Sequence, residues 1–564
     1  MESDGTCTRP PDGTATVAPD EGTSISGADI VLTMADPDVR PEPYAGNGWQ
    51  SFHIVDQADG SVGIRNPYTH LVLTMSDQDV RATPYTGNAW QSFWIVDQAD
   101  GSVGIRNNYY GTALTMSDEY VRATPYAGNA YQSFVLVPQA DGSTGIRSFY
   151  QRAAYSTFWG TPDTREAIKR VGNWYQNSDR QPTGFYLPPE NRLELRLRLV
   201  NLAADSQPTL YIGAPDTHPD FRTYMESRPY PLHDGLNYVT DPAGGMVYFQ
   251  MTGVGRRAEV TFRSGVLKAP FFEHGKTTPE QYRNMLATLT QAPQAELASK
   301  RVIVTVDRAV ALKYQDVDQN ALMETYEKIV SVEEAVLGLD GSMPLHTPAP
   351  LRFHLTLGNR SGVGSAHAAH YYTTYAVEYG AELLTVAGLG TSWGMWHELG
   401  HQNQMFGYLH WDDLIEITVN IASLAVQRAF GQRSRLLETD AGGKDIWDKV
   451  LAKINTPSFK VTDLDPFEYL AALEQLRLAF GDDFWPRMNK VTREKYQSDG
   501  YRIYPPQPAY DNLALFASIT ANADLRGFFA AWGIPVTEAR QAEIAALNLP
   551  RPATDPTTLR EPRS

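Results

Sequence analysis

This sequence has almost no cysteine and fewer positive than negative residues. Its 564 residues include a single cysteine, Cys7, so no internal disulfide and no cysteine-rich metal site can form. The net charge is −17, and no cluster of Lys and Arg offers a face to phosphate groups. We therefore expect neither nucleic acid nor an anionic membrane surface as a partner.

Long apolar runs are also missing. No segment approaches the ~20 apolar residues that span a bilayer, so no transmembrane segment is predicted. The first residues of the given sequence lack the basic start and the apolar run of a signal peptide. With 42% hydrophobic and 20% charged residues, the chain has the balance of a globular protein with material for several cores.

One pattern occurs three times at the front of the chain, with a spacing of 41 residues. Each copy alternates short β-like runs with Asp-Gly and Gly-Asn turn signals and has no helical period. Three all-β units predict a closed β-trefoil over residues 26–155, because closure removes the exposed strand edges. The recurring segments are Leu32-Thr33-Met34 (again at 73–75 and 114–116) and Gly46–Phe52 (again at 87–93 and 128–134).

The Gln-Ser-Phe triplet of each copy, followed by Asp-Gly and Ile-Arg, resembles the Gln-x-Trp signature of ricin-type β-trefoil lectins, with Phe in place of Trp. The resemblance implies carbohydrate binding. Repeated Asp36, Asp77 and Asp118 are the candidates to bind sugar hydroxyls, although Asp is equally common in such turns.

The repeats also depart from the lectin pattern. The aspartate that these lectins usually carry in a Leu-Asp-Val segment is absent, and threonines stand in that neighbourhood at positions 33, 74 and 115. We expect Phe52, Phe93 and Phe134 to fill the interior of the trefoil rather than to bind a ligand.

The middle of the chain changes from β to mixed α/β character. Strands with period-two alternation and Gly- or Pro-rich turns predict a β-sandwich before residue 270, and a helix opens at Thr278-Pro279. The predicted strands are Leu193–Val200, Thr209–Gly213, Met246–Met251, Ala258–Phe262, Val302–Val306, Leu351–Leu357 and Glu382–Val386, and a long helix is predicted over Gln319–Val336.

The segment from His397 to His401 contains the pattern His-Glu-x-x-His. On a helix, residues four apart leave the same face one turn apart, so both imidazoles can converge on one zinc at roughly 2.0–2.1 Å. Glu398 falls beside them, near enough to act on water as a general base without being a ligand. We expect Ser392 to cap this helix and Gly400 to leave room behind the metal.

Zinc needs a third protein ligand, and Glu416 is the preferred candidate. It is embedded in an apolar run, where a carboxylate needs a strong reason to face inward, and coordination would be that reason. Competing candidates are His410, Asp412 and Asp413, but capping of the second helix explains the two aspartates more simply.

These residues resemble the enhancin and enhancin-like zinc metallopeptidases, many of which attack mucins. His397, Glu398, His401 and Glu416 match that family's His-Glu-x-x-His and Glu motif in order. The resemblance extends over residues 183–550. It implies a β-sandwich followed by a gluzincin-like α/β catalytic domain with a helical C-terminal part, and secreted, extracellular action on glycoproteins.

Substrate binding leads to two further expectations. The run Leu383–Leu389, just before the motif helix, is predicted to bind substrate as an edge strand. A donor to the developing oxyanion is also expected. His370, Tyr371 and Tyr372 are compatible with that role, but surface or core packing explains each of them more simply, so none is assigned.

The expected organisation is a flexible segment 1–25, a β-trefoil over 26–155, a linker and β-sandwich over 156–270, a zinc metallopeptidase domain over 271–550 and a tail over 551–564. The expected function is a zinc-dependent endopeptidase for mucin-type glycoproteins, with a lectin-like module that raises its local concentration at glycans. The alternative is a glycan-binding lectin or adhesin with an inactive peptidase-like domain. A toxin that uses the trefoil for cell entry would differ in target rather than in chemistry.

Overall fold

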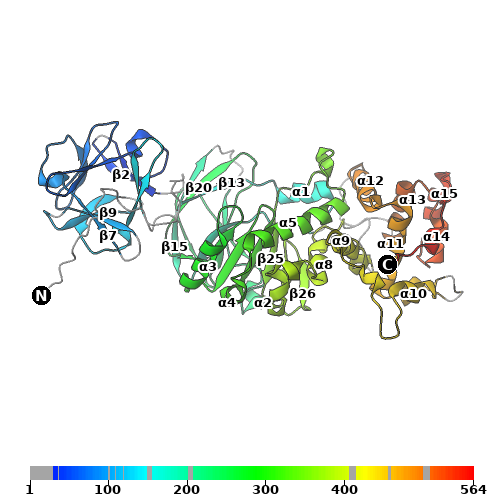
Figure 1. The fold of residues 1–564 in the computed structure, drawn as a ribbon. Coiled ribbons are helices and arrows are strands. Elements are labelled where there is room, and N and C mark those ends of the chain that lie inside the picture. The colour runs from blue at the N-terminus through cyan, green and yellow to red at the C-terminus, as the bar shows by residue number, and fades with distance from the viewer. Residues whose placement is uncertain are drawn as a thin grey trace.

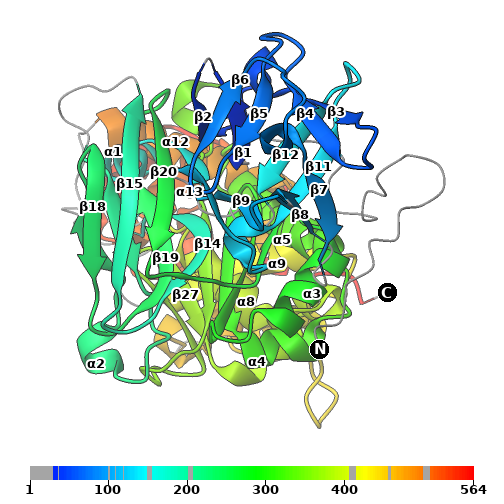
Figure 2. The same cartoon turned by 90° about the vertical axis from the view of Figure 1, so that its left-hand side faces the viewer.

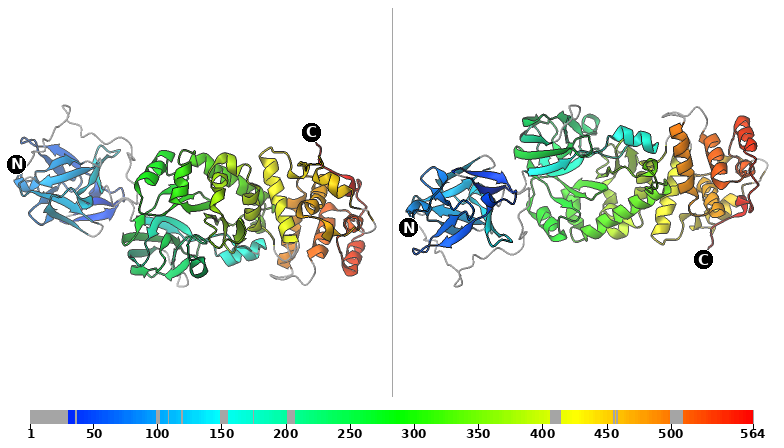
Figure 3. Two further views of the ribbon diagram at one scale, coloured as in Figure 1. Left: turned by 90° about the horizontal axis from the view of Figure 1, so that it is seen from below. Right: turned by 90° about the horizontal axis from the view of Figure 1, so that it is seen from above.

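The computed structural model describes residues 30–35, 37–98, 102–107, 109–117, 120–148, 155–173, 175–200, 207–405, 414–454, 456, 459–498 and 509–563. Three bodies follow one another along the molecule: a β body made of the repeats, a central body built on β-sheets, and a body of helices (Figures 1 and 3). The segment 1–25, expected to be flexible, lies outside the described residues.

Each of the three repeats contributes four strands, with a short 3₁₀ turn between the second and the third. These turns are Gly48–Gln50, Ala89–Gln91 and Ala130–Gln132. The strands are β1 Ile30–Met34, β2 Val39–Pro43, β3 His53–Asp56, β4 Val62–Arg65, β5 Val72–Met75, β6 Val80–Thr83, β7 Trp94–Asp97, β8 Val103–Asn107, β9 Thr112–Met116, β10 Val121–Pro125, β11 Phe134–Pro138 and β12 Thr144–Ser148.

The repeats close into a ring through equivalent glutamines. The Gln57 side chain donates to the Gln91 carbonyl at 3.0 Å, and Gln98 donates in the same way to Gln132 at 3.0 Å. Gln139 then returns to the Gln50 carbonyl at 3.3 Å. Strand β1 pairs antiparallel with β12, so the two ends of the repeat region (residues 30–148) meet. The three repeated phenylalanines are fully buried in its core, as expected: Phe52, Phe93 and Phe134.

Two antiparallel sheets packed face to face form the next part of the chain. Apolar side chains from both sheets, among them Phe158, Leu195 and Phe249, share one core between them. This arrangement agrees with the alternation that predicted a sandwich. One sheet has the order β13 Tyr155–Trp159, β20 Arg257–Ser264, β15 Arg192–Val200 and β18 Gly235–Thr240, and the other has β17 Arg228–Pro231, β16 Thr209–Ile212, β19 Gly245–Gln250, β14 Gln181–Leu187 and β21 Leu267–Lys268.

A mixed sheet of six strands lies beside the sandwich, and helices cover it (Figure 2). Its edge strand β26 pairs only with β27 among the described residues, antiparallel to it. The strand order is β22 Phe271–Glu273, β23 Gln294–Ala298, β24 Val302–Asp307, β25 Phe353–Leu357, β27 Tyr372–Tyr375 and β26 Ala366–Ala369. The helices between β22 and β25 are α3 Pro279–Thr288, α4 Arg308–Ala311 and α5 Gln319–Val336.

The strand predicted over Glu382–Val386 is wrong. The chain forms two short helices there, α6 Gly380–Leu383 and α7 Val386–Leu389. The hydroxyl of Thr385 accepts from the Gly388 amide at 2.9 Å and caps α7, which a run of apolar letters does not reveal. The substrate-binding edge strand expected at Leu383–Leu389 is therefore wrong too, and β26 is the strand whose edge is available.

Of the remaining helices, those from residue 446 onward make up the far end of the molecule (Figure 1). Among the described residues, no helix is both long and apolar enough to cross a membrane. The C-terminal segment packs onto this body, because the Gln475 side chain donates to the carbonyls of Thr557 and Leu559. The helices are α8 Trp393–His401, α9 Ile415–Ala429, α10 Ile446–Leu451, α11 Pro466–Phe480, α12 Phe484–Ser498, α13 Ala509–Ala521, α14 Arg526–Ala531 and α15 Glu538–Ala546, with α1 Thr164–Val171 and α2 Phe221–Tyr224 earlier in the chain.

A buried polar cluster joins the sandwich to the mixed sheet. The Tyr248 hydroxyl on β19 donates to Glu296 on β23 at 2.5 Å, and Thr305 donates to the same carboxyl oxygen at 2.8 Å. Thr305 also contacts His354 at 2.9 Å. Burial raises the pKa of Glu296 to about 7 and lowers the pKa of His354 to about 3.

Candidate metal centre

Helix α8 presents an apolar face to the core and its histidines to a cleft. Met395, Trp396 and Leu399 are buried in the same core as the mixed sheet. Ser392 caps the helix as expected, since its hydroxyl accepts from the Met395 amide at 3.3 Å. His397 is partly exposed on the opposite side. The metal motif therefore lies on a helix whose buried apolar residues fix its position.

Gly400 allows α8 and α9 to approach each other closely. A Cβ at this position would lie 2.9 Å from a methyl group of Val419 and 3.3 Å from the Val419 carbonyl. The glycine therefore makes room for the second helix, rather than only for a metal as expected from the sequence. This close approach brings Glu416, in the first turn of α9, opposite the two histidines.

Three donor atoms converge at the mouth of this helix pair. The Nε2 atoms of His397 and His401 are 3.1 Å apart. The Oε2 atom of Glu416 lies 3.0 Å from the first and 3.6 Å from the second. These residues form the cluster of potential metal ligands found among the described residues.

The tautomer of His397 follows from its neighbour Asn420. The Trp393 indole N–H, which can only donate, contacts Asn420 Oδ1 at 3.2 Å, and the Asn420 amide nitrogen donates to the Glu416 carbonyl at 2.8 Å. The atom that faces His397 Nδ1 at 2.8 Å is thus the amide oxygen. Nδ1 must donate to it, which leaves a lone pair on Nε2.

His401 is fixed in the same way by Gln404. The Gln404 amide nitrogen donates to the Ile415 carbonyl at 2.8 Å and to Thr418 at 3.1 Å. Its oxygen therefore accepts from His401 Nδ1 at 2.7 Å. Both imidazoles present an Nε2 lone pair to the cleft, and such partners typically orient metal-ligating histidines.

The donor set fits zinc. Two lone pairs and a carboxylate oxygen facing one another at 3.0–3.6 Å repel unless a cation or a proton lies between them. Ligands at 2.0–2.1 Å from a tetrahedral zinc are themselves roughly 3.3 Å apart, so the separations match. Three protein ligands with an open fourth position are the arrangement of catalytic zinc sites.

Glu416 is more exposed than the sequence argument assumed, and that part of the prediction is wrong. Its apolar neighbours Leu414 and Ile417 are buried on the other side of α9, while 64% of the Glu416 side chain is exposed. The helical period places the Glu416 carboxylate on the side of α9 that faces the cleft, and the side chain is not buried among its apolar neighbours.

Glu398 lines a cleft of about 330 Å³ together with His401, Glu416 and the edge strand β26. Burial raises the pKa of Glu398. The carboxyl group is not a member of the ligand cluster. It lies on the cleft wall beside that cluster, where a general base would stand.

Tyr175 is a cleft residue that sequence reasoning missed. It lines the same space as Glu398 and Glu416. Burial, and then the charges of these two glutamates, raise the pKa of its hydroxyl, which therefore stays protonated. Hydrogen bonds on both sides of Tyr175 hold its segment, since Asn173 donates to the Gln402 carbonyl and the Gln176 amide to the His370 carbonyl. No local motif surrounds Tyr175, so only its position in space identifies it.

The other candidates lie elsewhere. Tyr371 and Tyr372 are buried, His370 is exposed and paired with Gln176, and none of the three lines the cleft. Asp77 is exposed at a bend between β5 and β6. The remaining candidates fall outside the described residues: Asp36, Asp118, His410, Asp412 and Asp413.

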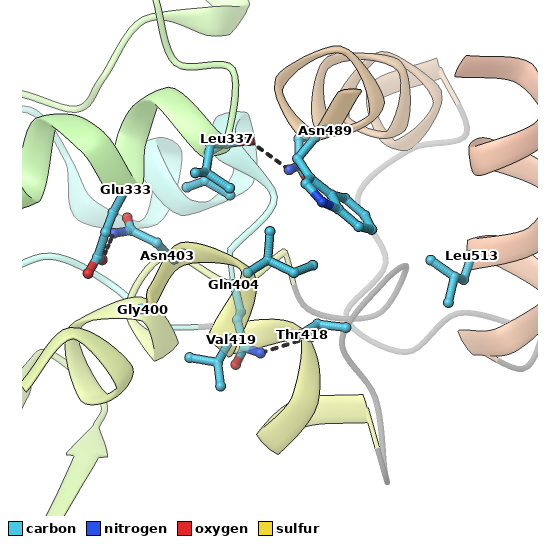
Figure 4. Close-up of a pocket in the computed structure, with 13 residues that line it drawn as sticks. Glu333, Leu337, Gly400, Asn403, Gln404, Thr418, Val419, Asn489 and Leu513 are labelled. Atoms are coloured by element: carbon cyan, nitrogen blue, oxygen red, sulfur yellow. Dashed lines mark hydrogen bonds between the residues drawn. The ribbon is translucent and has the colours of Figure 1, made fainter. Parts of the chain in front are cut away.

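A second, smaller cavity of about 30 Å³ lies beside the cleft and shares Gln404 with it (Figure 4). It lies between α5, α8, α9 and α12, with Gly400, Val419 and Leu337 among its walls. Asn403 donates to the buried Glu333 at its border at 3.0 Å. Its volume suits about one water molecule, so it offers no room for a substrate.

Two protein families match parts of this chain. The family described as "Peptidase M60, enhancin and enhancin-like" matches residues 265–533. The family described as "N-terminal domain of M60-like peptidases" matches residues 161–263. Over residues 161–533 the chain matches the M60 peptidases. The family resemblance predicted from the metal motif is confirmed, and the two matches meet at the boundary between sandwich and mixed sheet.

Solved structures and curated relatives extend the M60 comparison. A functionally unknown conserved protein from Bacillus anthracis is similar at TM-score 0.63 and 24% identity, over 72% of this chain and 81% of that one. The M60 catalytic domain of Clostridium perfringens ZmpC, solved with the sialyl T antigen, is similar at TM-score 0.59 and 18% identity, over 72% and 82%. TRPM8 channel-associated factor 3 of Rattus norvegicus is 26% identical over 65% of this chain, which spans 39% of that relative's length.

Proposed function

We propose that this M60 family member is a zinc-dependent endopeptidase that hydrolyses peptide bonds of mucin-type glycoproteins. One observation carries the proposal: the Nε2 lone pairs of His397 and His401 and the Glu416 carboxylate converge on one point, with 3.0–3.6 Å between them. His397, His401 and Glu416 would hold the metal. When bound, zinc supplies Lewis acidity, which lowers the pKa of water and polarises a scissile carbonyl.

Glu398 moves the proton in this proposal. Its carboxylate stands on the cleft wall next to the ligand cluster, so it can take a proton from the attacking water. The same carboxyl group then returns the proton to the nitrogen of the leaving amine. Partial burial makes it a stronger base than a solvated carboxylate, because its pKa is raised towards the pH of the reaction.

The rest of the cleft would position the peptide. The edge strand β26, with Ala366, His367 and Ala368 on the cleft, offers backbone groups to an extended substrate. Tyr175 lines the same cleft with a protonated hydroxyl, which supports a role as donor to the oxygen that becomes negative in the transition state. The oxyanion donor left unassigned by the sequence is thereby proposed to be Tyr175.

A glycoprotein substrate is supported by the ZmpC relative, whose M60 domain was solved with a sialylated glycan. The ring of three four-stranded repeats supports a β-trefoil with a lectin-like role, which would keep the enzyme near glycans. Secretion is part of the same proposal, since mucins are extracellular. The alternative, a binding protein with an inactive peptidase-like domain, is favoured by the channel-associated relatives named above.

The test is cleavage of a glycosylated mucin by the protein and by Glu398→Gln, with the zinc content of both measured. We expect cleavage by the parent alone and about one zinc in both. Bound zinc without cleavage of any glycoprotein would favour the inactive binding protein. Absence of both zinc and cleavage would contradict the enzyme proposal.

A further inference from the structure

Large aromatic side chains stand exposed at the same position in all three repeats. Trp49 is 48% exposed, Trp90 is 45% exposed and Tyr131 is 51% exposed. Each is the middle residue of the 3₁₀ turn between the second and third strands of its repeat. About half of each of these side chains is exposed at the equivalent position of all three repeats, so they are not core residues. Exposure of this kind usually marks a binding surface.

The turns that carry these rings are held firmly. An asparagine caps each turn and accepts from the amide of the aromatic residue, as Asn47 does for Trp49 at 3.1 Å and Asn88 for Trp90 at 3.0 Å. The glutamine that follows each ring is buried and bonded inward. Gln91, for example, accepts from the Thr86 amide at 2.7 Å and donates to the Pro84 carbonyl at 2.8 Å. The backbone under each ring is therefore preorganised, which lowers the entropic cost of binding.

Neighbouring tyrosines widen two of the three surfaces. In the first repeat, the ring of exposed Tyr68 lies over Gly48, so closely that a Cβ there would be 2.6 Å from it. In the second repeat, Trp90 faces Tyr110 with 6.4 Å between ring centres, and Tyr110 contacts exposed Tyr109 edge-on at 4.9 Å. We call these groups, centred on Trp49, Trp90 and Tyr131, the aromatic platforms.

The chemistry around the platforms selects the ligand. Residues 26–155 contain no lysine, and their acidic residues outnumber their arginines, so an anionic ligand is disfavoured. Each platform is a single ring or a small group of rings beside an asparagine, not a broad apolar patch, so it suits neither a membrane nor a large protein interface. A pyranose fits, because one face of the sugar carries C–H groups that stack on a ring while its edge carries hydroxyls.

We propose that the three aromatic platforms each bind a neutral pyranose of a glycan chain. The inference deepens the lectin-like role proposed above and rests on it. It moves the binding surface away from the aspartates expected from the lectin resemblance, of which Asp77 is exposed between β5 and β6. Three equivalent platforms on one closed ring would engage several sugars of one glycoprotein, so that weak single contacts add to a high avidity.

The experiment measures binding of the full chain to immobilised mucin from which sialic acid has been removed. All proteins carry Glu398→Gln, so that cleavage cannot consume the surface. The test variant combines Trp49→Ala, Trp90→Ala and Tyr131→Ala. Two matched controls are Trp159→Ala, a tryptophan on β13 that is 57% exposed outside the repeats, and Asp77→Asn. Because the three rings are exposed, the melting temperature of the triple variant should stay close to that of the parent.

We expect the triple variant to lose about a hundredfold in apparent affinity, and both controls to bind like the parent. With fluorinated tryptophan, the disaccharide galactosyl-N-acetylgalactosamine should shift the fluorine resonances of Trp49 and Trp90 and leave that of Trp159 unchanged. Unchanged binding by the triple variant, loss of binding by Asp77→Asn alone, or a parent that binds no mucin would each overturn the inference. Cleavage of an unglycosylated protein by the chain with Glu398 intact, measured in parallel, tests the peptidase proposal separately.

Discussion

The cleft beside the metal-ligand cluster and the repeat region use side chains in opposite ways. In the cleft each position is occupied by a different residue, and contacts from distant parts of the chain help to hold the site, as when Asn420 accepts from His397. In the repeat region one local pattern recurs three times, with the same buried glutamine and the same exposed ring in each copy. Single substitutions should therefore be severe in the cleft and mild in the repeats.

The largest expected effect is that of His401→Ala. Removing one of two imidazole ligands leaves an incomplete site, so zinc should be lost and cleavage should fall by at least about a thousandfold. Metal content and cleavage rate are the measurements. His370→Ala, a change at an exposed histidine outside the cleft, is the matched control and should keep both. Full activity of His401→Ala would contradict the prediction that single substitutions in the cleft are severe.

Tyr175→Phe removes a hydroxyl and keeps the ring. If that hydroxyl donates to the oxyanion, kcat should fall by about a hundredfold while KM and zinc content change little. A rise in KM alone would instead assign Tyr175 to substrate binding. A variant as active as the parent would leave the cleft without a known oxyanion donor.

Asn420→Leu tests whether the residue that orients His397 is needed for zinc binding, as the proposed ligands are. It removes the oxygen that accepts from His397 Nδ1, so zinc affinity should weaken by about 10–100-fold. Asn420→Asp keeps an acceptor at that place and should recover most of the affinity. Competition with a chelator measures both variants, and equal affinity in the two would refute the proposed orientation of the imidazole.

Glu296→Gln extends the comparison to a buried carboxyl group outside the cleft. The pKa of Glu296 is raised from 4.5 to about 7, so between these values the folded protein holds a proton that the unfolded chain has lost. Its stabilising contribution is complete below pH 4.5 and is lost as the pH rises towards 7. The free energy of unfolding of the parent should thus fall by about 2 kcal/mol from pH 5 to pH 8, and that of Glu296→Gln should not show this fall. The control Glu280→Gln, at an exposed position, should behave like the parent.

The smallest expected effect is that of a single platform. Trp90→Ala should weaken mucin binding only about threefold, because two further platforms remain. Trp49→Ala should match it, and only the combination should be severe. A single variant that abolishes binding would show that the repeats are not equivalent, and the contrast with the cleft would fail.

The sequence was most informative where function depends on local spacing. Two histidines four apart share a helix face wherever the helix lies, so His397 and His401 could be paired without a structure. The 41-residue period likewise predicted three similar β units and their buried phenylalanines. Strands with a clear period of two, such as Arg192–Val200, were also found close to their observed bounds.

The sequence was less informative where function depends on contacts across the chain. Asn420 and Gln404 orient the imidazoles, but nothing nearby in the sequence distinguishes them from ordinary helix residues. The segment Glu382–Val386 has the composition of a strand, and its helical form depends on a threonine cap and tight packing at Gly388. Glu416 was proposed as a ligand for the wrong reason, since it projects into the cleft from the outer face of its helix.

The ring of glutamine contacts has an evolutionary and practical consequence. Each repeat donates a glutamine hydrogen bond to the next, and Gln139 of the third repeat donates to the Gln50 carbonyl of the first. These contacts therefore do not distinguish one repeat as the first. A gene that began at any of the three copies would encode the same closed body, which is what successive tandem duplications of one ancestral segment would leave behind. New chain ends or an inserted domain should accordingly be tolerated equally well at each of the junctions between copies.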